Sequence, residues 1–204
     1  MYEELRRRIL SAAIAPGTAI NQEQLAGELG VSTTPLREAL RRLESDGLVT
    51  LLAHREAIVS PLDPTELAAV YEVRESLDPL AAALAAERHT DAEAKAIRKA
   101  ADRARRPGRE DHLTVNRRYH MAIYGACHNS VLIETLDALW DRSDRYRRAV
   151  GFMATEPAIQ QEHEAIAAAV LARQPDESAR LMRAHIGRTR AAFQQLQREE
   201  SGNE

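Results

Sequence analysis

Four side chains in the second half of the 204-residue chain have the types and spacing of a metal site. Asn116 and His120 are four residues apart, so a helix would place both on one face. His163 and His185 each fall among apolar residues at helical spacing, which would turn both toward a helical core. Three imidazole nitrogens and one amide oxygen can bind a divalent transition metal (zinc, nickel or manganese) and leave positions open for water or a ligand.

The sequence leaves a second interpretation of these histidines open. A single histidine on an apolar helix face is more often a hydrogen-bonded core residue than a metal ligand. The spacing does not show that the three rings converge, and His112, one turn before Asn116, is a competing ligand. His54, His89 and His128 fall in turns or at helix ends, where we expect them at the surface.

A second group of side chains has the pattern of a DNA-reading helix that begins near Ser32. Leucines recur there at helical spacing and should pack inward, namely Leu36, Leu40 and Leu43. The opposite face offers short hydroxyl side chains followed by arginines, the donors that suit a major groove and its phosphates. The candidate DNA-contacting residues are Ser32, Thr33, Thr34, Arg37 and Arg41, with His54 and Arg55 in a following turn that would reach the minor groove or the backbone.

The same arginines also allow a simpler interpretation. Glu38 and Glu44 lie close to Arg37 and Arg41 in the sequence, and local ion pairs would make this face only a solvated helix surface. Residues 1–62 carry 7 arginines against 8 acidic residues, a net charge of −1, so DNA binding would depend on a local basic face.

The elements that would position both groups differ between the two parts of the chain. Residues 1–62 predict short elements: a helix from Glu4 to Ile14, a helix ending at Leu29 that Asn21 caps, a helix from about 32 to 46, and strands at 48–52 and 57–60. Residues 63–204 predict helices at 64–88, about 90–105, 109–128, about 130–150, from near 155 and from 175. We therefore predict a mainly α protein, with an N-terminal winged helix-turn-helix DNA-binding domain (1–62) and a C-terminal all-α antiparallel helical bundle for effector binding and dimerisation (63–204).

Composition narrows the class of protein further. A single cysteine, Cys127, excludes an internal disulfide framework and a four-cysteine zinc site, and 4% aromatic residues argue against a stacking platform for single strands. No apolar run approaches the roughly 20 residues of a membrane span, and the first residues lack a secretory signal. These features predict a cytoplasmic protein with no membrane partner.

The N-terminal pattern resembles the GntR family of bacterial transcription regulators. The resemblance lies in the run from Leu25 to Val49 and in the upstream segment from Ile14 to Gly17. It implies a winged helix that binds a palindromic double-stranded DNA operator as a homodimer. Thr33 stands where the family usually has arginine, and Glu56 stands where the wing often has glycine. Because Glu56 repels phosphate and stiffens the backbone, we predict a weaker or shifted operator.

The C-terminal pattern resembles the effector domain of the FadR subfamily, the type called FCD. The resemblance lies in three segments, from Asn116 to Tyr124, from Glu162 to Ile166 and from Ala184 to Ile186. It implies a divalent metal held by Asn116, His120, His163 and His185. Many members have aspartate at the first of these positions, so the neutral amide should hold the metal less tightly.

The same resemblance implies a small organic acid effector beside the metal. Arg74 matches a recurrent arginine of the first effector-domain helix and would clamp a carboxylate at two points. An exposed ion pair with Glu75 or Asp78 is an equal alternative for Arg74. Asn129 is a second candidate for effector binding.

These patterns favour a metabolite-responsive transcription regulator, more often a repressor than an activator in such families, and not an enzyme. An alternative is a metal-dependent enzyme that uses the three histidines, although Glu162 and Glu164, next to His163, should point away from it. A pure metal sensor is the third interpretation.

Overall fold

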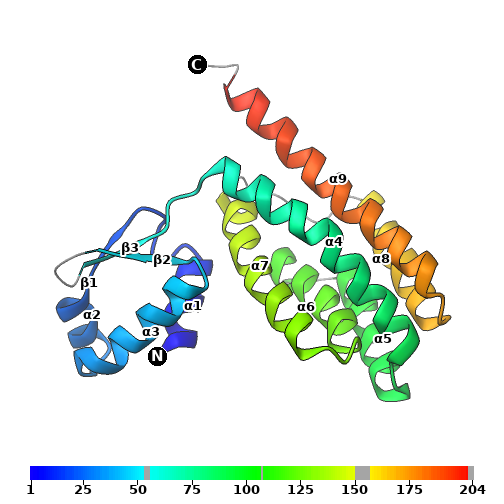
Figure 1. The fold of residues 1–204 in the computed structure, drawn as a ribbon, viewed down its shortest axis with the longest axis horizontal. Coiled ribbons are helices and arrows are strands. Elements are labelled where there is room, and N and C mark those ends of the chain that lie inside the picture. The colour runs from blue at the N-terminus through cyan, green and yellow to red at the C-terminus, as the bar shows by residue number, and fades with distance from the viewer. Residues whose placement is uncertain (53–55, 107, 150–156, 202–204) are drawn as a thin grey trace. The chain divides into compact units, whose positions relative to one another are not determined.

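The computed structural model describes residues 1–52, 56–106, 108–149 and 157–201, with side chains up to residue 195 (Figure 1). The chain forms two compact units. One consists of Met1–Asp63 with Asp141–Val150, and the other consists of Pro64–Trp140 with Gly151–Glu204. Among the described residues, no helix has both the length and the apolar character needed to cross a bilayer.

The first unit combines three short helices with a three-stranded sheet (Figure 1). Its elements are α1 (Tyr2–Leu10), β1 (Ala19–Asn21), α2 (Gln22–Glu28), α3 (Thr33–Ser45), β2 (Val49–Leu51) and β3 (Glu56–Val59). The strands are antiparallel in the order β1-β3-β2, and Ile58 of β3 pairs with Ala19 on one side and Thr50 on the other. Helix, turn, helix and β-hairpin in this order form a winged helix-turn-helix.

Local signals explain most of these elements. The Asn21 side chain accepts hydrogen bonds from the backbone N–H groups of Glu23 and Gln24, both at 3.0 Å, and so caps α2. Gly30 allows the left-handed turn between α2 and α3, with φ at +65°. The buried face of α3 packs against α1, α2 and the strands, which forms the core of this unit.

Two sequence expectations for this unit need correction. The first helix ends at Leu10 and not at Ile14, because Ala12 adopts a left-handed backbone conformation with φ at 58°. The sequence also missed β1, a strand of three residues in which only Ile20 is buried. Its pairing with β3 is a long-range contact that no local periodicity reveals.

The second unit is all-helical in its described part, as the sequence predicted (Figure 1). The helices are α4 (Pro64–Arg88), α5 (Asp91–Arg105), α6 (His112–Gly125), α7 (Ser130–Ala149), α8 (Pro157–Leu171) and α9 (Pro175–Ser201), and the last turns of α7 group with the first unit. Helices α4 and α9 lie side by side, α5 packs on α6, and α8 contacts α4, α5 and α9. The predicted fold class is therefore confirmed.

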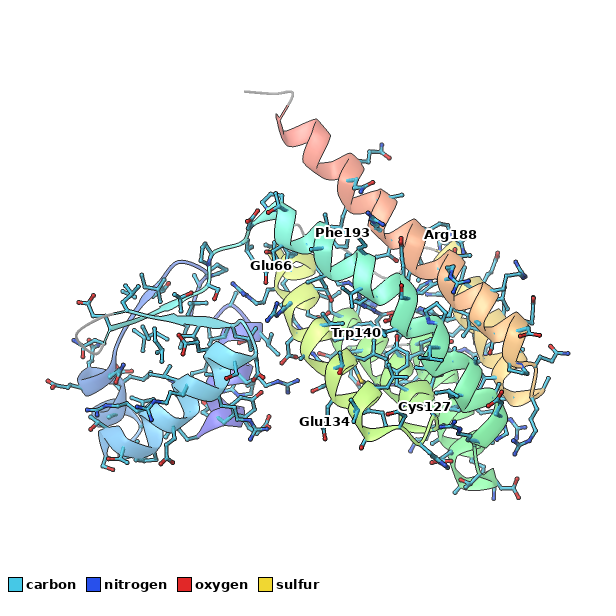
Figure 2. All side chains as sticks on the ribbon, in the orientation of Figure 1. Glu66, Cys127, Glu134, Trp140, Arg188 and Phe193 are labelled. Carbon is cyan, nitrogen blue, oxygen red and sulfur yellow. The ribbon has the colours of Figure 1, made fainter. Side chains whose placement is uncertain are left out.

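The interior of this bundle is aromatic and polar as well as aliphatic. Tyr71, Tyr119, Tyr124 and Trp140 have no exposed surface, and Figure 2 shows Trp140 inside the bundle. A capping box fixes the start of α5, because Thr90 and Glu93 exchange side-chain and backbone hydrogen bonds.

Candidate functional site

Three histidines from three different helices converge inside the bundle. His120 of α6, His163 of α8 and His185 of α9 are 0%, 3% and 3% exposed, and each offers a ring nitrogen within 4.8 Å of those of the others. The ring centroids are 5.2 Å apart for His120–His163 and His120–His185, and 4.8 Å apart for His163–His185. Such a cluster provides the nitrogen donors that a divalent transition metal prefers.

Asn116 adds a polar atom to the same helix face. It lies one turn before His120 on α6 and is 5% exposed. Its side-chain oxygen Oδ1 is buried and has no hydrogen-bond partner in the described part of the structure. Leaving a buried acceptor unsatisfied costs about 1–3 kcal/mol. A metal ion would satisfy this oxygen, so the residues present fit a site of three nitrogens and one oxygen.

The hydrogen bonds around His120 fix which of its nitrogens can bind a metal. Nδ1 lies 3.1 Å from the hydroxyl oxygen of Tyr124, and that hydroxyl donates its only proton to Asp78 Oδ2 at 2.7 Å. Nδ1 must therefore carry the proton and donate it to the Tyr124 oxygen. Nε2 is left deprotonated, which is the form that coordinates a metal.

Arg74 anchors the other end of this chain of hydrogen bonds. Its guanidinium pairs with Asp78, with Nη2 and Oδ2 2.8 Å apart, and both side chains are 0% exposed. Burial acts to lower the pKa of Arg74, but Asp78 and the neighbouring tyrosines raise it above its ordinary value. Arg74 also lies over the ring of Trp140, 4.2 Å from its centroid. The predicted alternative of an exposed ion pair is therefore wrong in one respect: Arg74 does pair with Asp78, but the pair is buried.

His185 has a carboxylate partner, Glu162, that the sequence did not predict. Its Nδ1 lies 2.7 Å from Oε2 of Glu162, and Oε1 of the same carboxylate lies 2.6 Å from Nε of Arg188. Burial raises the pKa of Glu162, but the hydrogen bonds from His185 and Arg188 lower it below its ordinary value overall. The carboxylate of Glu162, the residue before His163, is thus directed at α9, where it contacts His185 and Arg188.

The remaining histidines lie outside the cluster. His112 is the half-buried first residue of α6 and does not belong to the described three-histidine group. His128 is exposed and contacts Glu93, with Nε2 and Oε1 2.9 Å apart. The expected surface position of His89 is wrong, because it is 6% exposed and its Nε2 lies 3.2 Å from the Val170 carbonyl oxygen.

Asn129 has a structural contact of its own. Its side-chain oxygen accepts a hydrogen bond from the backbone N–H of Leu132 at 3.2 Å, in the first turn of α7. This is the geometry of a helix cap. A role in effector binding remains a prediction for both Asn129 and Arg74.

Helix α3, the predicted DNA-reading helix, has the two faces that its sequence predicts. Its three leucines are fully buried, while Ser32, Thr34 and Arg41 are exposed and Thr33 and Arg37 are half-buried. Ser32 occupies the N-cap position, but its side chain makes no capping hydrogen bond. His54 and Arg55 lie outside the described residues.

The local ion pairs that would neutralise this face do not form among the described residues. Neither Arg37 nor Arg41 has an ion-pair partner there, and Glu44 instead accepts a hydrogen bond from the Leu51 backbone N–H at 3.1 Å. Both arginines line a hollow of about 160 Å³ between α3 and the hairpin, together with Glu56. In the described part of the structure, Glu56 is thus the acidic residue that shares this hollow with the two arginines.

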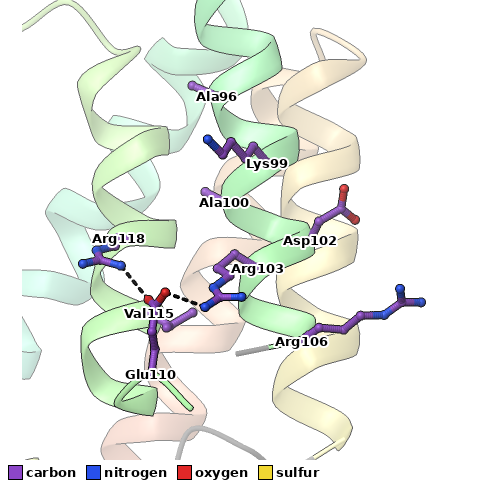
Figure 3. A pocket seen from close by; sticks show the side chains of 9 residues that line it. All are labelled: Ala96, Lys99, Ala100, Asp102, Arg103, Arg106, Glu110, Val115 and Arg118. Carbon is purple, nitrogen blue, oxygen red and sulfur yellow. Dashed lines mark hydrogen bonds and ion pairs between the residues drawn. The ribbon is translucent and has the colours of Figure 1, made fainter. Parts of the chain in front are cut away.

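A larger hollow lies away from the histidines. Side chains of α5, α6 and the segment between them enclose about 560 Å³, and Figure 3 shows Glu110 between Arg103 and Arg118. The two ion-pair distances are 2.5 Å to Arg103 and 2.6 Å to Arg118. These side chains are 38% to 64% exposed, so the pairs contribute little to stability and chiefly connect α5 with α6.

Comparison with known proteins decides the family. Residues 1–59 match the bacterial regulatory proteins of the gntR family, and residues 69–188 match the FCD domain. The chain belongs to the GntR family. It is a transcriptional regulator of the GntR/FCD type, consistent with the FadR-like subfamily, and regulators of this family bind DNA operators.

Individual relatives agree with this assignment. The Nta operon transcriptional regulator of Aminobacter aminovorans is 32% identical over 174 residues, which is 84% of this chain and 82% of that protein. The HTH-type transcriptional repressor GlaR of Escherichia coli is 27% identical, over 91% and 90% of the two chains. The solved structure of E. coli McbR/YncC superposes with a TM-score of 0.80 over 96% of this chain and 95% of that one; at 23% identity it supports the fold.

Three residues of this GntR-family regulator escaped the sequence analysis as parts of the site, namely Asp78, Tyr124 and Glu162. Two of them carried a usable signal. Tyr124 is one helical turn after His120, and Asp78 is one turn after Arg74, so each pair shares a helix face. The link between Tyr124 and Asp78 joins α6 to α4 and needs the tertiary structure.

Proposed function

We propose that this GntR-family regulator is a cytoplasmic, homodimeric repressor whose operator binding is modulated by a small carboxylate bound beside a divalent metal. The convergence of His120, His163 and His185 in the bundle interior carries this proposal. The orphaned oxygen of Asn116 supplies a fourth donor. When bound, the metal provides a positive charge with exchangeable positions for a carboxylate oxygen. Arg74 and Asn129 remain the proposed effector-binding residues on the protein side.

The DNA-binding role is assigned to residues 1–62, with α3 entering the major groove. The supporting observation is that Arg37 and Arg41 have no ion-pair partner in the described structure and lie on the face opposite the buried leucines. Ser32, Thr33 and Thr34 would place hydroxyl groups near the N-terminus of the same helix. His54 and Arg55 are proposed to contact the minor groove or the DNA backbone.

The dimerisation role is assigned to residues 63–204. Val73 and Leu80 are two turns apart on α4 and are 45% and 46% exposed, so they form one apolar stripe on that helix. A second copy of the chain that covers this stripe would present two recognition helices to a palindromic operator. An effector that binds one dimer geometry better than another would then change operator affinity.

The carboxylates near the histidines favour regulation over a metal-dependent enzyme. Glu162 is held between His185 and Arg188, and Glu164 is half-exposed and lies 3.7 Å from Arg105. A general base needs a carboxylate directed at a substrate or a water molecule. Both carboxylates are engaged in contacts that stabilise the site or the surface.

Footprinting and mobility-shift titration on the promoter region of its own gene test the proposal. We expect the metal-loaded protein to protect a palindrome from cleavage and to release it when a suitable organic acid is added. His163→Ala should abolish this response and leave metal-free DNA binding intact, whereas His128→Ala, outside the cluster, should behave as the wild type. A change in operator affinity caused by metal alone would identify a pure metal sensor. Turnover of the acids would identify an enzyme. Absence of any protected DNA under every condition would refute the operator claim.

A further inference from the structure

A third hollow is lined by Glu162, the carboxylate that contacts His185 of the three-histidine cluster. It encloses about 300 Å³ between α8 and α9. Its apolar walls are Ala158, Ile159, Ala191 and Ala192, and its charged residues are Glu162 and Arg188. Figure 2 labels Arg188 on α9 with its side chain directed away from the helix axis, and this side chain is 57% exposed.

One carboxylate connects this hollow to a proposed metal ligand. Glu162 is only 18% exposed and uses its two oxygens on different partners, Oε2 on the His185 ring and Oε1 on Arg188. Arg188 contacts the carboxylate with Nε 2.6 Å from Oε1, and because the Arg188 side chain is 57% exposed, an anion from solvent can reach its guanidinium. The hollow thus pairs an apolar wall with a partly exposed guanidinium.

We propose that this hollow is the binding site for a small carboxylate with a short apolar chain, which pairs with Arg188 and thereby strengthens metal binding through Glu162. This inference rests on the proposed function, and it names Arg188, a residue not predicted from the sequence, as a carboxylate-binding residue. The carboxylate competes with Glu162 for the guanidinium, while its chain covers the apolar wall formed by the alanines and Ile159.

The direction of the coupling follows from charge. The carboxylate of Glu162 accepts a hydrogen bond from Nδ1 of His185. While the positive charge of Arg188 is paired with this carboxylate, the carboxylate is a weaker acceptor. When an external anion takes Arg188, Glu162 becomes a stronger acceptor, and this makes Nε2 of His185 a more basic ligand. Metal and anion therefore bind with positive cooperativity, and by linkage each raises the affinity of the other by the same factor.

Zn²⁺ competition titrations with a chromophoric chelator, with and without butyrate, test this coupling. For the wild type we expect butyrate to raise Zn²⁺ affinity by at least about fivefold, the lower end of ordinary coupling. In Arg188→Gln, Glu162 is already released, so Zn²⁺ affinity without butyrate should rise toward the butyrate-loaded wild-type value, and butyrate should add nothing. Arg180→Gln, on the same helix but paired with Glu177, should behave as the wild type.

Butyrate binding to the metal-free protein, followed by NMR, separates this inference from the proposed metal site. Loss of butyrate binding in Arg188→Gln supports the anion site whatever the metal result. If wild-type protein binds no Zn²⁺, the metal proposal and the coupling both fail. If Zn²⁺ binds but butyrate raises its affinity equally in wild type and Arg188→Gln, the anion contacts the metal directly and the Arg188 site is refuted.

Discussion

Removing the hydroxyl group of Tyr124 tests whether the buried hydrogen bonds that connect Arg74, Asp78, Tyr124 and His120 hold His120 in the form that binds a metal. In Tyr124→Phe, Nδ1 of His120 loses the oxygen to which it donates, and Asp78 loses one donor but keeps Arg74. His120 is then free to carry its proton on Nε2, which blocks coordination. Loss of such an outer hydrogen bond typically lowers metal affinity about 10–100-fold, or about 1.4–2.7 kcal/mol.

Tyr119 provides a matched control on the same helix. It is also fully buried, but its hydroxyl donates to the backbone carbonyl of His163 at 2.7 Å and not to a ring nitrogen. Tyr119→Phe and Tyr124→Phe should each lower the free energy of unfolding of the metal-free protein by about 1–3 kcal/mol. Only Tyr124→Phe should also lower the affinity of the protein for the metal.

Two measurements decide the matter: Zn²⁺ affinity by competition titration, and denaturant unfolding of the metal-free protein. Wild-type Zn²⁺ affinity in Tyr124→Phe would refute the inferred tautomer of His120. An equal loss of affinity in both variants would mean that the tyrosines act through general packing, and the hydrogen-bond chain would have no specific role in positioning the ligand.

Three further predictions follow from individual residues. Glu56→Gly should tighten operator binding in mobility-shift titrations by about 1 kcal/mol, the scale of one unit-charge repulsion at about 4 Å in water, and unchanged affinity would contradict this. Val73→Asp should give a monomer in sedimentation experiments, whereas Val131→Asp, at a position 72% exposed on α7, should leave the dimer intact; a dimeric Val73→Asp would exclude α4 as the interface. Glu93→Gln should lower the free energy of unfolding by about 1 kcal/mol at pH 7. The pKa of Glu93 is lowered to about 2 by hydrogen bonds from Thr90 and His128, so this carboxylate stabilises the fold above its ordinary pKa and loses that effect as the pH falls toward 2. If Glu93→Gln is still less stable than the wild type at pH 2, the negative charge of Glu93 is not the source of the stabilisation.

The sequence by itself determined the elements whose signals are local. The leucines of α3 fix its buried face, Asn21 and Thr90 begin their helices with side-chain caps, and Gly30 allows the turn before α3. Such signals act within one or two helical turns, so periodicity and capping residues reveal them. The same locality explains why β1, which depends on β3, was missed.

The candidate site divides in the same way. Helical spacing predicted the shared face of Asn116 and His120, and the resemblance to the FCD domain implied the set of four proposed ligands, whereas spacing alone left His112 as a competitor. Only the packing of α6, α8 and α9 brought the three imidazoles within 4.8 Å of one another. Only the packing of α4 on α6 and of α8 on α9 placed Asp78 and Glu162 behind the rings, because contacts between helices depend on how several faces pack together and not on the spacing within one of them.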